Sequence, residues 1–411
     1  MQFRPYDAKR DREAVLRIWR EVGWIEAGEK GAMAMDGRIG VGAAMVCEVE
    51  GAAESLVLTA PAVIRYLDEE LPMCAVTGVA TSRVARRRGI ASRLAALALA
   101  QDAAEGSLVA GLGVFEQGYY DRLGFGSASY THWVKLDPAQ IRVTGGHRPP
   151  VRLTLDDGER MHASRLTRRR GHGAMNILPA ASTCSEMHFA KNPIGLGYCD
   201  GPDGSLSHHF WGSTNNVEHG PYRIWWMAYH SREEFLELMA LIGSLEDQVH
   251  LVILCEPPGI QMQDLLDKPF ARQTISERSE YESGIDAAAP YQLRICDLAG
   301  CLEHTHLRGD PVRFNLCLSD PIEALLDDDV PWRGVAGEYV VTLGPDSGVK
   351  FGQDSSLPTM SASVNAFTRL WLGVRPATGL SYTDQLNGPG ELLSQLDTLL
   401  CLPTPNLDWS F

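Results

Sequence analysis

The chain has 411 residues, of which 45% are hydrophobic and 22% are charged. This balance is that of a globular protein and excludes a disordered or fibrous one, and at about 100 to 200 residues per domain the length indicates two or three domains. The formal net charge of −15 repels phosphate backbones, so it argues against general nucleic-acid binding. It would attract a small cationic substrate, but an acidic surface that serves only solubility explains it at least as well.

The sequence features that bear on cellular location predict the cytoplasm. The first residues lack the apolar core of a secretion signal, and no stretch of about 18 uncharged apolar residues suits a membrane span. The nine cysteines are scattered, with no Cys-x-x-Cys pair, and are expected as reduced core thiols. We expect a cytoplasmic protein that binds no membrane.

The first segment, residues 1–145, alternates helix and strand. Apolar residues recur on one face over 7–22, which predicts an amphipathic helix. Short apolar runs bounded by Gly, Pro or charged clusters predict the strands that follow, and an Ala- and Leu-rich run predicts a second helix. The strands are expected at 45–50, 55–60, 73–81 and 107–114, and the second helix at 91–104.

A Gly- and Pro-rich cluster at 145–150 marks a boundary. Two further segments of mixed helix and strand follow, 146–285 and 286–411, and the second ends in a Pro-rich extended tail. The fold class is therefore α/β (α+β). The expected helices are 156–169, 232–242, 362–372 and 390–399, and the expected strands are 223–229, 250–255, 291–297, 312–318 and 337–343.

The sharpest signal lies in residues 79–94, Val-Ala-Thr-Ser-Arg-Val-Ala-Arg-Arg-Arg-Gly-Ile-Ala-Ser-Arg-Leu. A strand ends, a basic loop turns and a helix begins. Free N–H groups in the first turn of a helix, with the positive end of its dipole, stabilise an anion, and Gly89 and Ala91 allow close approach of the backbone. Cations at a helix start oppose the dipole unless an anion compensates them. The pattern predicts a pyrophosphate site.

This loop resembles the pyrophosphate motif of the GNAT (Gcn5-related) N-acetyltransferases. A second run, 115–126, reads Phe-Glu-Gln-Gly-Tyr-Tyr-Asp-Arg-Leu-Gly-Phe-Gly, and its Tyr-x-x-x-Gly-Phe resembles the fourth conserved block of that fold, where a tyrosine hydroxyl lies beside the CoA sulfur. The run Arg168–Gly173 also fits Arg-x-x-Gly-x-Gly, but it follows a predicted helix and not a strand, so we interpret it as part of a degenerate copy.

The order of the segments resembles the Eis (enhanced intracellular survival) acetyltransferases, with residues 331–340 and an aromatic last residue as further marks. The resemblance implies a catalytic GNAT domain at 1–145, a degenerate GNAT-like domain at 146–285 and a sterol-carrier-protein-like domain at 286–411. It also implies acetyl-CoA as co-substrate, no metal, and a homohexamer. The cofactor-binding residues implied are Val79, Ala80, Thr81, Arg87, Arg88, Gly89, Ile90, Ala91, Ser92, Phe115 and Glu116.

Two residues are expected to move protons. Tyr120 is the expected proton donor: its pKa of about 10 keeps it protonated, and a hydroxyl beside the developing thiolate, whose thiol has a pKa of about 8.5, can protonate it or donate a strong hydrogen bond to it. Tyr119 is its rival. The resemblance assigns the base to the terminal α-carboxylate, here on Phe411. Glu26, Glu29 and Asp408 are alternatives.

The function expected is acetyl transfer from acetyl-CoA to primary amines of polyamine- or aminoglycoside-like substrates. Acetylation of protein lysines is an alternative, and a non-catalytic acyl-CoA- or lipid-binding protein is an alternative of another class. Surface or core roles are favoured over metal binding for His208–His209 and for Cys301 with His304 and His306, since their spacing fits no structural zinc pattern. Three tryptophans are candidates either for an amine pocket or for the core, Trp24, Trp225 and Trp226.

Overall fold

The computed structural model describes residues 1–26, 28–115, 118–267 and 280–410. The chain forms two compact units, and each is described here by itself. Unit 1 comprises residues 1–129, 172–177 and 289–411, and unit 2 comprises residues 130–171 and 178–288.

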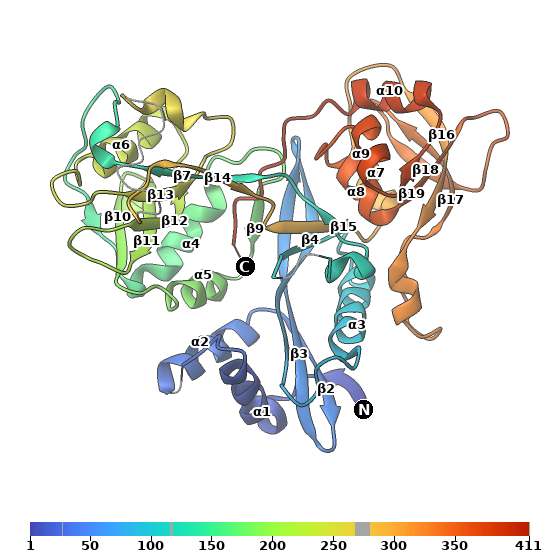
Figure 1. The fold of residues 1–411 in the computed structure, drawn as a ribbon, viewed down its shortest axis with the longest axis horizontal. Coiled ribbons are helices and arrows are strands. Elements are labelled where there is room, and N and C mark those ends of the chain that lie inside the picture. The colour runs from blue at the N-terminus through green and yellow to red at the C-terminus, as the bar shows by residue number, and fades with distance from the viewer. Residues whose placement is uncertain (27, 116–117, 268–279, 411) are drawn as a thin grey trace. The chain divides into compact units, whose positions relative to one another are not determined.

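Unit 1 contains an eight-stranded sheet in the order β1-β2-β3-β4-β5-β15-β6, with β9 paired to β3 (Figure 1). Neighbouring strands of this sheet are antiparallel, except β4 and β5, which are parallel and are connected by a helix. The strands are β1 (Gln2–Pro5), β2 (Ala43–Val49), β3 (Ala52–Tyr66), β4 (Glu69–Thr81), β5 (Val109–Gly113), β6 (Gly126–Ser127), β9 (Met175–Ile177) and β15 (Tyr291–Ile295).

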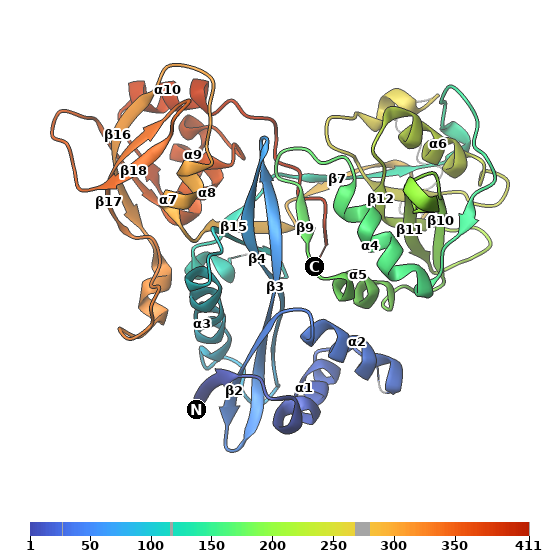
Figure 2. The same ribbon diagram turned by 180° about the vertical axis from the view of Figure 1, so that it is seen from behind.

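Three helices accompany this sheet: α1 (Ala8–Glu21), α2 (Glu29–Ile39) and α3 (Ile90–Ala104). The carboxylate of Asp7 caps α1 by accepting a hydrogen bond from the N–H of Lys9 at 2.8 Å, and the apolar face of α1 is buried. α3 is apolar on most sides and runs along the β3–β4 hairpin (Figure 2). Its burial fixes the loop before it at the end of β4.

The C-terminal part of unit 1 has a five-stranded sheet in the order β18-β17-β16-β19-β20. After its last helix the chain is extended, and Leu407 and Trp409 are buried. The N–H of Asn406 donates to the carbonyl of His172 at 2.8 Å, so the tail lies beside β9 (Figures 1 and 2). The elements are α7 (Leu298–Glu303), β16 (Val312–Ser319), β17 (Gly337–Leu343), β18 (Gly348–Phe351), β19 (Thr359–Ser363), α8 (Val364–Trp371), α9 (Ala377–Thr383), β20 (Leu386–Asn387) and α10 (Gly390–Leu399).

Unit 2 is built on a seven-stranded sheet in the order β14-β7-β13-β12-β11-β10-β8. The hydroxyl of Ser231 caps its helix α6 by accepting from the N–H of Glu234 at 3.2 Å. The elements are β7 (Thr131–Leu136), β8 (Val151–Arg152), α4 (Gly158–Thr167), α5 (Ala180–Met187), β10 (Pro193–Tyr198), β11 (His208–Thr214), β12 (Tyr222–Ala228), α6 (Arg232–Gly243), β13 (Val252–Cys255) and β14 (Gly284–Ala288).

The predicted mixed α/β fold class is confirmed, and each predicted helix and strand has a counterpart. The units, however, part after Ser129 and not at 145, because β7 pairs with β13 and β14 of unit 2. β15, at the start of the predicted third segment, completes the first sheet. The division into three domains stays a prediction. Within the described ranges, no helix is long and apolar enough to cross a membrane.

Candidate active site

The parallel strands β4 and β5 separate near their carboxyl ends. Their last paired residues are Val76 and Leu112, whereas β4 continues to Thr81. The register between β3 and β4 also shifts, because Leu58 faces Gly78 and the next residue faces Val76. The extra residue, Thr77, is a bulge that bends the strand. The end of β4 therefore has no partner on the β5 side and presents its backbone there.

This gap between β4 and β5 opens into a pocket of about 650 Å³. The pocket is walled by the end of β4, the following loop, the first turn of α3 and the segment after β5. Its lining residues are Val22, Trp24, Val76, Thr77, Gly78, Val79, Ala80, Thr81, Ala85, Arg86, Arg87, Gly89, Ile90, Ala91, Ser92, Gly113, Phe115, Tyr119, Tyr120 and Arg122.

The loop before α3 offers a group of main-chain donors. The first helical hydrogen bond of α3 is made by Arg93, whose N–H reaches the carbonyl of Gly89 at 3.2 Å. Among the described residues, the N–H groups of residues 87–92 donate no main-chain hydrogen bond of good geometry. Gly89 has a φ of 74°, and an added Cβ there would meet nothing within 4 Å. The left-handed backbone, and not lack of space, is thus what favours glycine.

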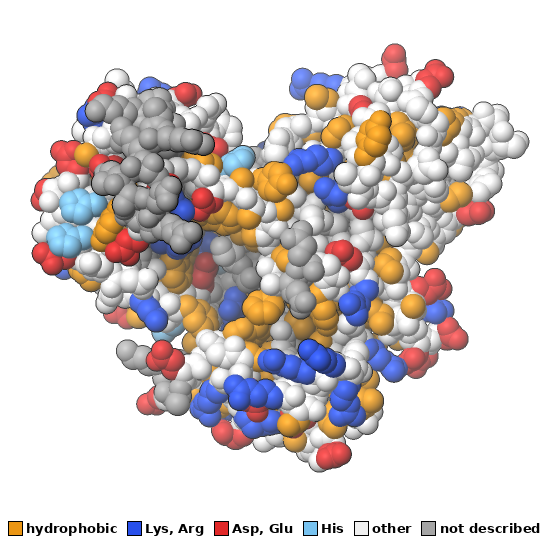
Figure 3. Space-filling view, in the orientation of Figure 1, with side chains coloured by type: hydrophobic (Ala, Val, Ile, Leu, Met, Phe, Trp, Pro, Cys, Tyr) orange, Lys and Arg blue, Asp and Glu red, His pale blue; other side chains and the backbone are white. Residues whose placement is uncertain are grey.

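The charge of this loop suits an anion. Arg86, Arg87 and Arg88 are all exposed, and Figure 3 shows basic side chains gathered on the face of unit 1 near α1. Unpaired amides at the positive end of a helix dipole together with mobile guanidinium groups stabilise a phosphate. The arrangement can therefore hold a diphosphate against the first turn of α3.

Tyr120 begins a short 3₁₀ turn, Tyr120–Leu123, and lies at the wall of the pocket. Only 8% of the residue is exposed, and burial raises the pKa of its hydroxyl to about 12. Within the described chain this hydroxyl has no hydrogen-bond partner. A phenol that stays protonated and has no partner is free to donate a hydrogen bond to negative charge that develops on a leaving group.

Tyr119 lies in the same pocket but is already engaged. Its hydroxyl accepts a hydrogen bond from the Oγ of Ser92 at 3.1 Å, and its ring stands edge-on to that of Tyr120 with centroids 4.9 Å apart. The guanidinium carbon of Arg122 lies 5.3 Å from the centroid of the Tyr119 ring. Tyr119 therefore links the phenol pair to the first turn of α3.

The structure brings together nine of the eleven predicted cofactor residues. Arg88 is exposed beside the pocket without lining it. Glu116 and Phe411 lie outside the described residues, so their roles stay predictions. The residues brought together are Val79, Ala80, Thr81, Arg87, Gly89, Ile90, Ala91, Ser92 and Phe115.

Sequence reasoning missed the bulge at Thr77 and left the role of Trp24 open. Gly78 was the available signal, because a glycine inside a strand marks a bulge or a close approach; an added Cβ there would contact the ring of Trp24 at 3.5 Å. Trp24 is half-buried, lines the pocket and packs edge-on to Trp19 at 5.4 Å. An aromatic wall at the acceptor end suits a cation.

The described lining of the pocket includes no carboxylate. Of the alternative bases, Glu26 and Glu29 are exposed and do not line it. The Oδ1 of Asp408 accepts a hydrogen bond from the N–H of Met175 at 3.2 Å, which ties the tail to β9. The described side chains thus supply an anion site and a proton donor.

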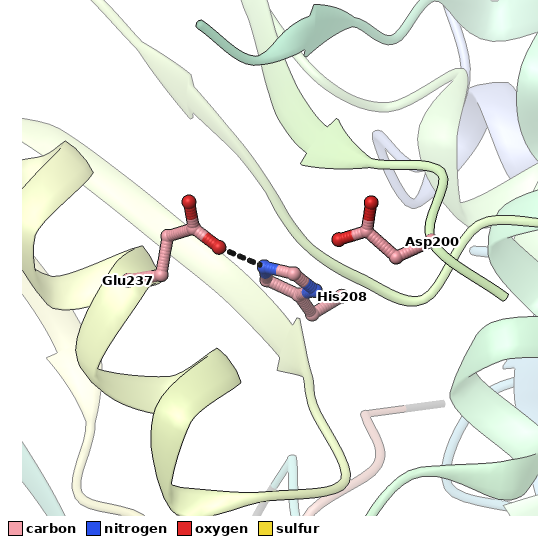
Figure 4. Close-up of side chains that lie close together, drawn as sticks. All are labelled: Asp200, His208 and Glu237. Atoms are coloured by element: carbon pink, nitrogen blue, oxygen red, sulfur yellow. Dashed lines mark hydrogen bonds and ion pairs between the residues drawn. The ribbon is translucent and has the colours of Figure 1, made fainter. Parts of the chain in front are cut away.

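The histidines for which metal binding was disfavoured make other contacts. The Nδ1 atoms of His304 and His306 lie at 2.9 and 3.0 Å from the carbonyls of Gly300 and Pro345. In unit 2, Asp200, His208 and Glu237 converge closely enough to share a cation (Figure 4).

A guanidinium already lies in this cluster of unit 2. Arg148 makes ion pairs of 2.6 Å with Asp200 and 2.8 Å with Glu237, and the Nε2 of His208 lies 3.1 Å from Glu237. The Arg148 hydrogen bonds lower the pKa of Glu237 to about 2, and burial lowers that of His208. We interpret the cluster as an ion network that fixes the 145–150 connection to the sheet of unit 2.

The comparisons with known proteins agree with this geometry. Residues 3–128 match the family described as the acetyltransferase (GNAT) domain. The chain carries a GNAT acetyltransferase domain. It is therefore an acetyltransferase, and such enzymes take the acetyl group from acetyl-CoA. No curated protein sequence matches the chain.

Solved structures extend the likeness over the whole chain. A probable N-acyltransferase from Enterococcus faecalis is 18% identical, with a TM-score of 0.80, over 100% of this chain and 99% of that one. A GCN5-related N-acetyltransferase from Anabaena variabilis is 15% identical, with a TM-score of 0.77, and Eis1 from Mycobacterium abscessus is 18% identical, with a TM-score of 0.73; each covers 100% of both chains. At these identities the likeness shows the fold alone. The GNAT resemblance is confirmed, and membership of the Eis family stays a prediction.

Proposed function

We propose that the protein is an acetyl-CoA-dependent N-acetyltransferase that acetylates primary amines of small cationic substrates, of the polyamine or aminoglycoside kind, by direct transfer. One observation carries the proposal. The unpaired amides of residues 87–92, the open edge of β4 and the free hydroxyl of Tyr120 meet in a single pocket.

Each part has a role in the proposed reaction. The amides before α3 and the arginines beside them bind the diphosphate of CoA, and the unpaired end of β4 binds the pantetheine arm. A main-chain amide of β4 then polarises the thioester carbonyl. The expected base, the α-carboxylate of Phe411, first takes one proton from the substrate ammonium. The neutral amine then attacks the thioester carbonyl, so that the C–N bond forms and the C–S bond breaks. Tyr120 gives its proton to the departing thiolate, and the proton lost from the acylated nitrogen restores the Tyr120 hydroxyl.

The acceptor is inferred from charge and from the aromatic wall. The net charge of −15 draws cations toward the protein, and Trp24 at the pocket can stabilise an ammonium group before it loses its proton. Protein lysine is the rival acceptor, and the same features suit it. The base, the cytoplasmic location and a hexameric assembly stay predictions.

The test is release of CoA thiol from acetyl-CoA with spermidine, tobramycin and an acetylatable lysine peptide, with products weighed by mass spectrometry. We expect acetylated polyamine or aminoglycoside, formed much faster than acetylated peptide. Faster acetylation of the peptide would replace the proposed acceptor with protein lysine. Binding of acetyl-CoA without turnover of any amine would contradict the proposal and favour an acyl-CoA-binding protein.

A further inference from the structure

The 3₁₀ turn that carries Tyr120 is held by side chains from the C-terminal part of unit 1. The side-chain amide of Asn365, in the first turn of α8, donates to the carbonyl of Asp121 at 2.9 Å and to that of Phe125 at 2.8 Å. The side-chain amide of Gln292, on β15, donates to the Oδ1 of Asp121 at 3.1 Å. One asparagine thus closes both ends of the segment 121–125.

A buried ion pair supports the middle of the same turn. Arg294 donates to the carbonyl of Leu123 and pairs with Asp320 at 2.6 Å, and both side chains are 0% exposed. Asp320 also accepts from the N–H of Val335 at 3.0 Å, and the ring of Trp332 lies under the Arg294 guanidinium at 4.9 Å. Trp332 and Val335 both belong to the run 331–340, so this run helps to support the turn.

Two glycines allow this close approach. At Gly124, with a φ of 82°, an added Cβ would lie 2.7 Å from Val364 and 2.8 Å from Arg294. At Gly126 it would lie 2.4 Å from the carbonyl of Asn365. The Gly-Phe-Gly that follows Tyr120 is therefore fitted to α8 and to the ion pair.

We propose that Asn365, supported by the Arg294–Asp320 pair, is a positioning residue that holds the Tyr120 hydroxyl toward the thioester sulfur. The inference rests on the proposed role of Tyr120 as proton donor. The hydroxyl of Tyr120 has no hydrogen bond in the described chain, so its direction depends on the backbone of its turn and on the packing of its ring against Tyr119 and Phe125. Holding the carbonyls of 121, 123 and 125 fixes that backbone.

The chain offers a matched control. Asn315, on β16, also ties two main-chain carbonyls with one side-chain amide, those of Asp354 at 2.8 Å and Leu357 at 3.1 Å. Those carbonyls belong to a loop that does not line the pocket. Asn315→Ala therefore removes the same kind of contact from the same part of unit 1 without touching the turn of Tyr120.

The experiment measures kcat, KM for acetyl-CoA and hydrogen exchange of residues 120–125 in Asn365→Ala and Asn315→Ala. We expect Asn365→Ala to lower kcat about tenfold and to speed exchange in the turn, with KM changed less than about twofold. Asn315→Ala should leave all three near the wild-type values per folded protein. Unchanged exchange in the turn, or equal kcat in the two variants, would overturn the inference.

A double mutant separates this inference from the proposed function. If Asn365 acts through Tyr120, then adding Asn365→Ala to Tyr120→Phe should lower kcat less than about twofold further. A full additional tenfold loss would mean that Asn365 acts elsewhere and would refute its positioning role alone. If Tyr120→Phe itself keeps the wild-type kcat, the proton-donor role and the positioning inference both fail, while acetyl transfer to amines can still stand.

Discussion

Two loops of this chain share the spacing of an Arg-x-x-Gly motif but differ in burial and in hydrogen bonding. The loop before α3 and the run Arg168–Gly173 both place a glycine three residues after an arginine and a small residue two further on. In the first loop the arginines are exposed and the amides of 87–92 donate no main-chain hydrogen bond of good geometry in the described chain. In the second, Arg168 is buried and donates to the carbonyl of Arg165 at 2.6 Å.

The amides differ in the same way. In the second run, the N–H of Arg169 reaches the carbonyl of Tyr229 and the N–H of Gly173 that of Arg65, each at 2.7 Å. This run joins α4 to the strand β9, so no helix begins after it. The spacing by itself therefore carries no chemistry. Where a helix follows, as in the first loop, the N–H groups of its first turn stay unpaired. Where a strand follows, as in the second run, the N–H groups are bonded to main-chain carbonyls.

The variant with the largest expected loss of kcat removes the proposed proton donor, Tyr120, which lines the same pocket as the first loop. Tyr120→Phe deletes one hydroxyl and keeps the ring, so we expect kcat to fall about 10²-fold with little change in the Kd for CoA. Tyr119→Phe is the control, because its hydroxyl is engaged with Ser92; it should lower kcat much less. A larger loss with Tyr119→Phe would transfer the donor role to that residue.

Much of this fold was predictable because its signals are local. The strand at 337–343 and the helix at 390–399 have the predicted bounds, since alternation and helical periodicity are strong there. The helix α2 was missed, because Gly31 and Gly37 weaken a helical pattern. The pairing of β15 with β5 was missed for another reason: it joins residues far apart in the sequence, and no local pattern records such a partner.

The residues of the site also separate into those that a local motif reveals and those that depend on distant contacts. Residues 87–92 and Tyr120 were found because each stands in a short motif whose chemistry is readable. The Arg294–Asp320 pair was not found, since a buried ion pair looks like two ordinary surface charges until the fold brings them together. Asn365 was missed likewise, because its partners lie in a distant segment.

The next test substitutes the glycine of each loop. Gly89→Ala places a Cβ on a left-handed backbone at a strain of roughly 1–2 kcal/mol. The free loop can relieve this strain by leaving the left-handed conformation, and CoA must restore it on binding, so we expect the Kd for CoA to rise about tenfold. Gly173→Ala is the matched change, at a φ of 82°, and its Cβ would lie 2.6 Å from that of Pro405. It should lower the free energy of unfolding by about 1–3 kcal/mol and leave the Kd unchanged. Calorimetry and thermal unfolding measure both, and a Kd shifted by Gly173→Ala alone would reverse the assignment of the two loops.

A smaller effect is expected in the pH profile. Burial raises the pKa of Tyr120 to about 12, and a donor must be protonated, so activity should be lost only as pH rises through that value. An ordinary tyrosine, with a pKa of about 10, would be about three-quarters ionised at pH 10.5 and would cost about fourfold in kcat. We expect kcat at pH 10.5 to stay near its plateau in brief assays at saturating substrates. A basic limb centred near pH 10 would mean that the hydroxyl is solvated, and that the pocket of the first loop does not seclude it.

The smallest effect concerns the charges of the two loops. Arg87→Gln removes one exposed guanidinium beside the unpaired amides, and we expect about a threefold rise in the Kd for CoA at low ionic strength that shrinks in 0.5 M salt, since exposed charges are screened. Arg169→Gln also removes an exposed guanidinium, but from a run whose own amide is bonded to Tyr229, so the Kd should not change. Calorimetry at two salt concentrations measures the difference. Equal and salt-dependent losses in both variants would show that CoA responds to the general charge of the protein, and the contrast between the loops would then rest on the unpaired amides alone.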